Sequence, residues 1–424
     1  MASHAPASLV PLLQRTGLAL ALLASLTAAG SLPARAQTFT VLHSFTGAMD
    51  GSSPFAGLSM DWAGNLYGTT SAGGVGYGGV FELERRGSGW LFQPLYSFAG
   101  GSDGEGPVAR VIVGPNGSLY GTTYAGGVAG CNGGYGCGTV FNLRPFPTVC
   151  RAALCGWQHN VLYRFNGSSD GANPLFGDVL FDATGNLYGT TQNGGSAGCG
   201  GAGCGTVFEL SPMSGSWIDT TVYRFTGEGS DGANPYAGVI FDAAGNLYGT
   251  TKAGGSQANG AIFRLSPAQS GWTETTLYSF QTQDGYWPYG GLVSDPSGNM
   301  YGTTTSGGLN GGGTVFALRP PDTVTVLVNL SGLIEGGPYG SLIMDAAGNL
   351  FGVAYDDGAY GNGSIFKLSP AGSGWTYTDL YDFTGGSDGS CPYGNVLLGS
   401  DGSLYGTAAE GGEHGYGTIW KLTP

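Results

Sequence analysis

The chain has 424 residues, of which 84 are glycine, and only 10% are charged while 41% are apolar. This apolar fraction is high enough to build a core, which excludes a disordered chain, and the glycines follow no three-residue period, which excludes collagen. The formal net charge of −14, without any cluster of Lys or Arg, argues against nucleic acid and anionic membranes as partners. So much glycine with so little charge predicts many tight turns and few surface helices.

The first 36 residues have the pattern of a secretory signal peptide. Arg15 precedes an apolar run that extends to Ala29, and Ala34-Arg35-Ala36 has the small-x-small pattern of a cleavage site. The run is too short for a comfortable membrane span, and an uncleaved anchor is the alternative. We therefore expect a signal peptide at 1–36, a mature domain at 37–424 that does not insert into a membrane, and a secreted protein, extracellular or periplasmic.

Six of the seven cysteines fall into close pairs. The pairs are Cys131 with Cys137, Cys150 with Cys155, and Cys199 with Cys204. In an exported protein such spacing predicts three short-range disulfides, although a four-cysteine zinc site built from the two pairs in glycine-rich loops is the alternative. Cys391 has no partner nearby in the sequence, and we expect its thiol to be reduced or buried.

The sequence is organised as a tandem repeat. The phrase Gly-Asn-Leu-Tyr-Gly-Thr-Thr occurs at 64–70, 185–191 and 245–251, and variants of it bring the copies to seven. With about 55 residues per copy, each copy holds four β-like runs separated by turn signals. The Asp-x-x-Gly-Asn spacing between the first two runs predicts a tight turn with a left-handed glycine, in which the Asp side chain caps the turn amides.

Seven copies of four antiparallel strands predict an all-β fold, namely a seven-bladed β-propeller. The mature chain begins with a run of the fourth-strand type at 41–45 and ends with a run of the third-strand type at 418–422. We therefore expect the N-terminal strand to complete the last blade, which removes the exposed edge of an open array. A parallel β-solenoid is the rival fold, but its rungs are much shorter than this period.

The same residues carry a family resemblance. The repeated Gly-Asn-Leu-Tyr-Gly-Thr-Thr, the Gly-Gly-x-x-Gly-x-Gly-Thr-Val-Phe-Glu-Leu segment and the Asp-Gly-x-x-Pro-Tyr element resemble the GloVer tandem repeat of exported bacterial proteins, over residues 39 to 424. The resemblance implies a signal peptide and no established activity. The family's variable surface anchors have no recognisable counterpart at the C-terminal end of this chain.

An acidic residue precedes each first strand, and six of the seven positions read Asp-Gly-x-x-Pro. The acids are Asp50, Asp103, Asp170, Asp231, Asp284, Glu335 and Asp388. One interpretation is a cation-attracting or calcium-supported ring on the face that carries the loops between fourth and first strands, with Asp103 and Asp170 as candidate ligand-binding residues. The alternative is that each acid caps its own turn.

One position in the first strand breaks the repeat rule. Glycine occupies it at Gly57, Gly177, Gly238 and Gly291, whereas Arg110, Ser341 and Asn395 occupy it in other copies. Such exceptions are where function is expected to show, so we treat Arg110, Ser341 and Asn395 as candidate ligand-binding residues, with drift of a degenerate repeat as the alternative.

Two other features concern binding. An aromatic residue recurs at one position of the second strand in every copy. One interpretation is a carbohydrate-binding platform, and the interpretation that we favour is packing between blades. The loops at 124–138 and 193–205 are longer than their counterparts, and loops on a rigid scaffold often form binding surfaces. We therefore expect an asymmetric face whose cleft lies nearest these two loops.

The sequence shows no nucleophile with its base, because His43, His159 and His414 lack a matching Ser/Asp motif. We expect no catalytic residue, no metal and no cofactor. The favoured function is a monomeric binding or interaction scaffold for a glycan or a protein on the top face. The alternatives are a lyase-like or lactonase-like propeller enzyme that uses the central channel, and a purely structural surface protein.

Overall fold

The structure is a computed structural model that describes Met1 and residues 37–146, 156–332 and 336–423. The predicted signal peptide beyond Met1, the pair Cys150 and Cys155, and Glu335 lie outside these residues. Residues Phe39–Thr423 form one compact unit.

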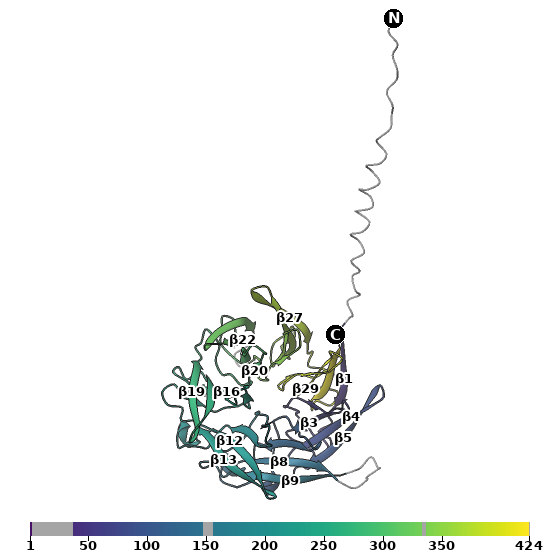
Figure 1. The fold of residues 1–424 in the computed structure, drawn as a ribbon. Helices are drawn as coiled ribbons and strands as arrows, with labels where there is room; N and C mark the ends of the chain where they lie inside the picture. Colours follow the sequence, from purple (N-terminus) through teal and green to yellow (C-terminus); the bar gives the residue numbers. More distant parts are fainter. Residues whose placement is uncertain (2–36, 147–155, 333–335, 424) are drawn as a thin grey trace. The chain divides into compact units, whose positions relative to one another are not determined.

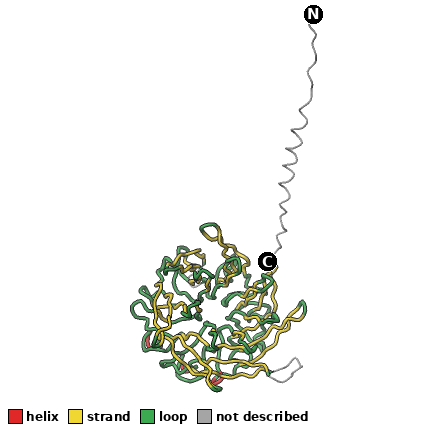
Figure 2. Tube along the Cα trace, in the orientation of Figure 1, coloured by secondary structure: helices red, strands yellow, loops and turns green. Residues whose placement is uncertain are grey.

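Seven four-stranded antiparallel sheets make up this unit, arranged as the blades of a propeller (Figure 1). The predicted fold class is therefore confirmed. Strands and loops account for nearly all of the described chain (Figure 2), apart from three short 3₁₀ helices at Gly101–Asp103, Asn132–Gly134 and Cys199–Gly201.

In each blade the strands follow one another from the innermost to the outermost. Blade 1 is β2 (Ser59–Met60), β3 (Leu66–Thr70), β4 (Gly79–Arg86) and β5 (Gly89–Ser97). Blade 2 is β6 (Ile112–Val113), β7 (Leu119–Thr123), β8 (Thr139–Pro145) and β9 (Trp157–Arg164). Blade 3 is β10 (Leu180–Phe181), β11 (Leu187–Thr191), β12 (Thr206–Met213) and β13 (Ser216–Arg224). Blade 4 is β15 (Ile240–Phe241), β16 (Leu247–Thr251), β18 (Ala261–Ala268) and β19 (Gly271–Ser279). Blade 5 is β20 (Val293–Ser294), β21 (Met300–Thr304), β22 (Gly311–Arg319) and β23 (Thr323–Ser331).

Blade 6 is β24 (Ile343–Met344), β25 (Leu350–Ala354), β26 (Ser364–Ala371) and β27 (Gly374–Asp382). Blade 7 combines β28 (Leu397–Leu398), β29 (Leu404–Ala408) and β30 (Thr418–Thr423) with β1 (Thr38–Ser44). A further two-stranded ladder joins β14 (Gly232–Ala233) to β17 (Ala253–Gly254). The inner strands are shorter than the sequence pattern predicts, with only two paired residues each.

The N-terminal strand closes the ring as expected. Strand β1 is the outermost strand of blade 7 and pairs with β30, so that in Figure 1 the first, purple strand lies beside the last, yellow ones. The contact continues past the strand, where Phe45 N–H donates to Gly417 O at 3.0 Å and Glu413 N–H donates to Ser44 Oγ at 2.9 Å. Closure gives blade 7 the same four strands as the other six blades.

Local chemistry fixes the turn between the first two strands. In blade 1 the Asp61 Oδ1 atom accepts hydrogen bonds from the backbone N–H groups of Ala63 and Asn65, at 2.8 and 2.9 Å. Gly64 has a φ of 85°, which glycine adopts without a steric penalty. The predicted capped turn is therefore present, and it sets the register of the hairpin that follows.

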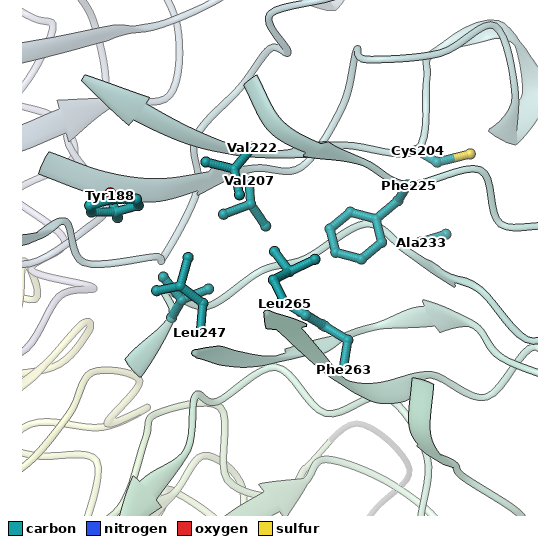
Figure 3. Packing of buried hydrophobic residues seen from close by; sticks show 10 residues of the cluster. Tyr188, Cys204, Val207, Val222, Phe225, Ala233, Leu247, Phe263 and Leu265 are labelled. Carbon is teal, nitrogen blue, oxygen red and sulfur yellow. The ribbon is translucent and has the colours of Figure 1, made fainter. Parts of the chain in front are cut away.

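The core lies between neighbouring blades. Tyr188 of blade 3 is 5% exposed and belongs to a cluster that includes Leu247, Phe263 and Leu265 of blade 4 (Figure 3). Strand glycines make room for these aromatics, since a Cβ on Gly249 would lie 2.6 Å from Phe263 Cζ. The second-strand aromatics therefore serve packing between blades, as favoured above.

The two ends of the ring differ. We call the loop face the end that carries the loops from fourth to first strands and from second to third strands, which bridge each other at Ser52 with Ala72 and at Glu105 with Ala125. We call the turn face the opposite end, which carries the Asp-x-x-Gly-Asn turns. Each inner strand runs from the loop face to the turn face, so residues early in it lie nearer the loop face.

Candidate functional site

The repeat-breaking position of the first strand lies ten residues before the second-strand aromatic. The strand register places Leu180 opposite Tyr188 and Ile240 opposite Tyr248, which makes Asp178, not Gly177, the equivalent of Gly238. Our assignment of Gly177 to this position is wrong. Blade 3 carries one extra residue between its proline and this strand, and the extra residue shifts the alignment by one.

Four of these side chains meet on the ring axis and form what we call the axial crossbar: Arg110, Asp178, Ser341 and Asn395. Arg110 Nη2 lies 2.6 Å and Nε 2.9 Å from Asp178 Oδ2. Asn395 Nδ2 donates to the same oxygen at 3.4 Å. Because Asp178 belongs to blade 3 and Asn395 to blade 7, this contact reaches across the ring.

The crossbar continues through backbone groups. Asn395 Oδ1 accepts from Ser341 N–H at 2.6 Å, and Ser341 Oγ accepts from Gly291 N–H at 2.8 Å. Arg110 N–H also donates to Asp178 Oδ1 at 3.2 Å. The structure thus brings together Arg110, Ser341 and Asn395, the three predicted exceptions, with a fourth residue that the alignment missed.

Six aromatic side chains lie on the loop-face side of the crossbar, and we call them the aromatic crown. They are Phe55, Phe176, Tyr236, Tyr289, Tyr339 and Tyr393, each two residues before the repeat-breaking position. Ring centroids are 4.3 Å apart for Tyr339 and Tyr393, 4.7 Å for Phe176 and Tyr393, and 4.5 Å for Tyr236 and Tyr289. Blade 2 has Val108 at this position. The crown is the functional candidate that sequence reasoning missed, although the Pro-Tyr part of the repeated element signalled it.

Burial of the crown changes its titration. Desolvation raises the pKa of the Tyr393 hydroxyl above its usual value, and the neighbouring tyrosine hydroxyls add to this effect. Burial likewise raises the pKa of Tyr236 to about 12. The crown hydroxyls therefore stay protonated at neutral pH and can donate hydrogen bonds.

A polar position borders the crown and differs between blades. Four residues after the second-strand aromatic, the chain places Ser71, Tyr124, Gln192, Lys252, Thr305, Tyr355 and Ala409. Gln192 Nε2 donates to Tyr236 Oη at 2.7 Å. Lys252 Nζ lies 5.2 Å from the ring centroid of Tyr236, 4.9 Å from that of Tyr289 and 5.5 Å from that of Trp287. This side of the crown thus combines aromatic rings with one cation and one amide.

Exposed tyrosines stand farther out on the loop face, and we call them the rim tyrosines. They are Tyr77, Tyr135, Tyr360 and Tyr416, exposed to 39%, 66%, 63% and 47%. Each follows Gly or Ala and precedes Gly in the loop between second and third strands. They belong to blades 1, 2, 6 and 7 respectively, which are neighbours around the ring. The backbone beneath them is fixed, as Tyr77 O accepts from Gly106 N–H and Tyr416 O accepts from Ser53 N–H, both at 3.0 Å.

The rim tyrosines bear on the predicted location of the binding surface. The loop at 124–138 contributes Tyr135, whereas the loop at 193–205 has Ala202 at the equivalent position. Figure 1 places blades 2 and 3 side by side. The proposed cleft near these two loops stays a prediction, and the exposed aromatic rings extend from it in the direction of blades 1, 7 and 6.

The predicted acids Asp103 and Asp170 do not join the crossbar. Asp103 accepts from Ala99 N–H at 2.7 Å and from Tyr96 Oη at 2.8 Å, and Asp170 accepts from Asn166 N–H and Tyr163 Oη, both at 2.9 Å. Both carboxylates therefore cap the turn after an outer strand, as in the structural alternative. Their role in ligand binding stays a prediction.

Asp50 and Asp388 also cap the turn after an outer strand. Burial works to raise the pKa of Asp50, but hydrogen bonds from the Thr46 hydroxyl and backbone and from His43 outweigh it and hold the pKa below its usual value. The Asp388 carboxylate accepts from Thr384 N–H at 2.8 Å and from Tyr381 Oη at 2.9 Å. Within residues 37–146, 156–332 and 336–423, no group of three or more His, Cys, Asp or Glu side chains is placed to hold a metal ion.

Two of the three predicted disulfides are present. Cys131 is bonded to Cys137 and Cys199 to Cys204, which rules out the four-cysteine zinc site. Cys391 is a free, half-buried thiol whose pKa is raised by burial, which agrees with the expectation of a reduced or buried thiol. In the part of the chain that the structure describes, we find no helix of the length and apolarity needed to cross a membrane.

The repeat identifies the family. The sequence profile described as the Gloeobacter/Verrucomicrobia repeat matches residues 30–200, 146–295 and 273–424. The chain belongs to this family. None of the curated proteins compared matches the chain.

Several solved structures are similar to the chain. A candidate 6-phosphogluconolactonase from Bacteroides uniformis aligns over 76% of this chain and 83% of its own, with 14% identity and a TM-score of 0.49. A protein of unknown function from Dyadobacter fermentans aligns over 80% and 96%, with 12% identity and a TM-score of 0.46. A gluconolactonase from Xanthomonas campestris aligns over 73% and 82%, with 14% identity and a TM-score of 0.40. At this similarity the matches carry no argument about activity.

Proposed function

We propose that this protein is an exported binding scaffold that engages a glycan through the loop face of its propeller. The observation that carries the proposal is the gathering of aromatic side chains on that one face, in the crown and among the rim tyrosines. Aromatic rings present flat apolar surfaces on which the C–H groups of a sugar ring pack, and tyrosine hydroxyls donate hydrogen bonds to sugar oxygens.

The polar neighbours of the crown support a sugar ligand. Gln192 and Lys252 provide an amide and a cation beside Tyr236, and few precisely placed polar groups among apolar ones are typical of ligand sites. The bridges between loops hold the rim tyrosines on a rigid backbone, so little conformational entropy is lost when a ligand binds.

We propose that the protein binds its ligand without catalysing a reaction. The polar groups of the crossbar are engaged with one another, since the Asp178 carboxylate accepts from both Arg110 and Asn395. His159 contacts Asp103 at 3.2 Å and stacks on Tyr96, which is a packing arrangement in an outer strand. The two disulfides fit an oxidising compartment, in keeping with secretion or a periplasmic location.

The test is a glycan and polysaccharide array probed with the mature protein, followed by calorimetry on any ligand found. Replacing Tyr77 and Tyr416 together by alanine is expected to weaken binding by about tenfold or more, because exposed aromatics dominate binding surfaces. The matched control is Trp62→Ala, which removes a fully exposed aromatic from the turn face. An array without ligands, or a rim variant that binds like the wild type, contradicts the proposal. Binding lost equally in the Trp62 control also counts against it.

A further inference from the structure

A second cavity lies on the ring axis, on the other side of the crossbar from the aromatic crown. Its volume is about 470 Å³, and it is lined by inner-strand residues of six blades from the crossbar toward the turn face. Of the crown, only Phe176 also lines this cavity, and only a cavity of about 20 Å³ remains between crown and crossbar, room for about one water molecule. The axis therefore holds a pocket on the turn-face side of the crossbar that shares only Phe176 with the proposed glycan surface.

The walls of this pocket are aliphatic. Two residues beyond the crossbar position, five neighbouring blades place a branched side chain: Ile112, Leu180, Ile240, Val293 and Ile343. All five side chains are partly exposed. Blade 1 has Ser59 instead, which is buried, donates to Val111 O and does not line the pocket. Exposed aliphatic surface gains free energy when a ligand covers it, by roughly 25 cal/mol per Å².

The closed end of the pocket is polar and electrically balanced. The Arg110 and Asp178 side chains are 27% and 19% exposed, so the ion pair is accessible to a ligand from the pocket side. A second anion there would face the Asp178 carboxylate in a chain of net charge −14, and a cation would face the Arg110 guanidinium. Each charged ligand thus meets one like and one opposite charge and gains little net Coulomb energy, although it loses its hydration on entry. A neutral polar group loses far less hydration.

We propose that this pocket binds one neutral small molecule with an apolar body and a single hydrogen-bonding head group. The body covers the aliphatic wall, and the head group, such as a hydroxyl, ester or ketone, hydrogen-bonds to the crossbar. This inference does not depend on the proposed glycan binding, because the two surfaces lie on opposite sides of the crossbar.

The probe for the experiment is N-phenyl-1-naphthylamine, a neutral amphiphile whose fluorescence rises in apolar surroundings, titrated into the mature protein. We expect saturable binding of one probe per chain. Nonanol is expected to displace it at a concentration about tenfold lower than nonanoate or nonylammonium, because only the charged heads lose strong hydration without a net Coulomb gain at the crossbar.

Two variants locate the probe. Ile240→Asn puts an amide into the wall and is expected to weaken binding by about tenfold, with Ile343→Asn as a second wall variant in another blade. The matched control is Ile218→Asn, at an exposed isoleucine on outer strand β13, which is expected to bind like the wild type. Far-ultraviolet circular dichroism confirms that each variant is folded. Absence of saturable binding, unchanged binding by both folded wall variants, or displacement by nonanoate as effective as by nonanol overturns the proposal.

Discussion

Replacing Asp219 by asparagine is expected to stabilise the protein at alkaline pH. Asp219 lies on the outer strand β13 of blade 3, where burial, followed by the nearby Asp170 carboxylate, raises the pKa of Asp219 to about 7, against the opposing effect of Arg224. Tyr163 also faces this pair, and its hydroxyl donates to Asp170. Within the described part of the chain, Asp219 Oδ1 and Asp170 Oδ1 are both buried without a hydrogen-bond partner.

The sign follows from proton binding. Between the usual aspartate pKa and pH 7, the folded protein keeps a proton on Asp219 that the unfolded chain has released, so stability is highest in acid and falls as pH rises toward 7. A shift of three units corresponds to about 4 kcal/mol, which solvent screening at a partly exposed site reduces to about 2 kcal/mol. Asparagine has the same shape and no charge to bury.

The assay is thermal unfolding of wild type and Asp219→Asn between pH 4.5 and 8.5. We expect equal midpoints near pH 4.5 and a variant more stable by about 2–3 °C at pH 8.5, given the unfolding entropy of a domain of this size. The control is His159→Gln, at the equivalent position of blade 2. There burial outweighs Asp103 and lowers the histidine pKa, so the wild type loses stability through this group as pH falls below 6.5. A pH profile of Asp219→Asn parallel to that of the wild type refutes the reasoning.

Three further outcomes are expected. Deleting residues 37–46 removes β1 from blade 7 and should lower the thermal midpoint of the whole unit; a truncated protein with the wild-type midpoint contradicts ring closure by this strand. Arg110→Met leaves the Asp178 carboxylate half-buried without its guanidinium and should cost about 2 kcal/mol, with part of the loss recovered by adding Asp178→Asn, as urea unfolding can check. Reducing the disulfides should raise protease sensitivity in their loops and change global stability by less than about 3 kcal/mol, because each closes a short loop; limited proteolysis beside calorimetry distinguishes the two effects.

The parts of the fold that sequence predicts are the local ones. The Asp61 turn is specified by residues within four positions of each other, and seven copies of such a hairpin with two more strands leave few architectures other than a propeller. The disulfides are likewise local. The strand order of blade 7 was also predictable, because the two chain ends carry complementary strand types.

The candidate sites were less accessible, because they depend on contacts between distant blades. Asp178 was missed because one extra residue earlier in blade 3 shifts the alignment, and its partner Arg110 lies 68 positions away. The crown was missed because each of its aromatics occurs once per copy and its packing appears only when six blades surround one axis. Asp103 illustrates the converse, since its turn-capping contacts are local and were anticipated.

Ring closure by β1 has a consequence for biosynthesis. This strand leaves the ribosome before every other strand of the propeller, whereas its partner β30 leaves it after them. The six other blades can assemble from contiguous segments while translation continues, whereas the seventh requires the two ends of almost 400 residues of chain to meet, a contact of very high sequence separation that forms slowly. Nascent chains should therefore carry an open-edged intermediate until β30 has been made.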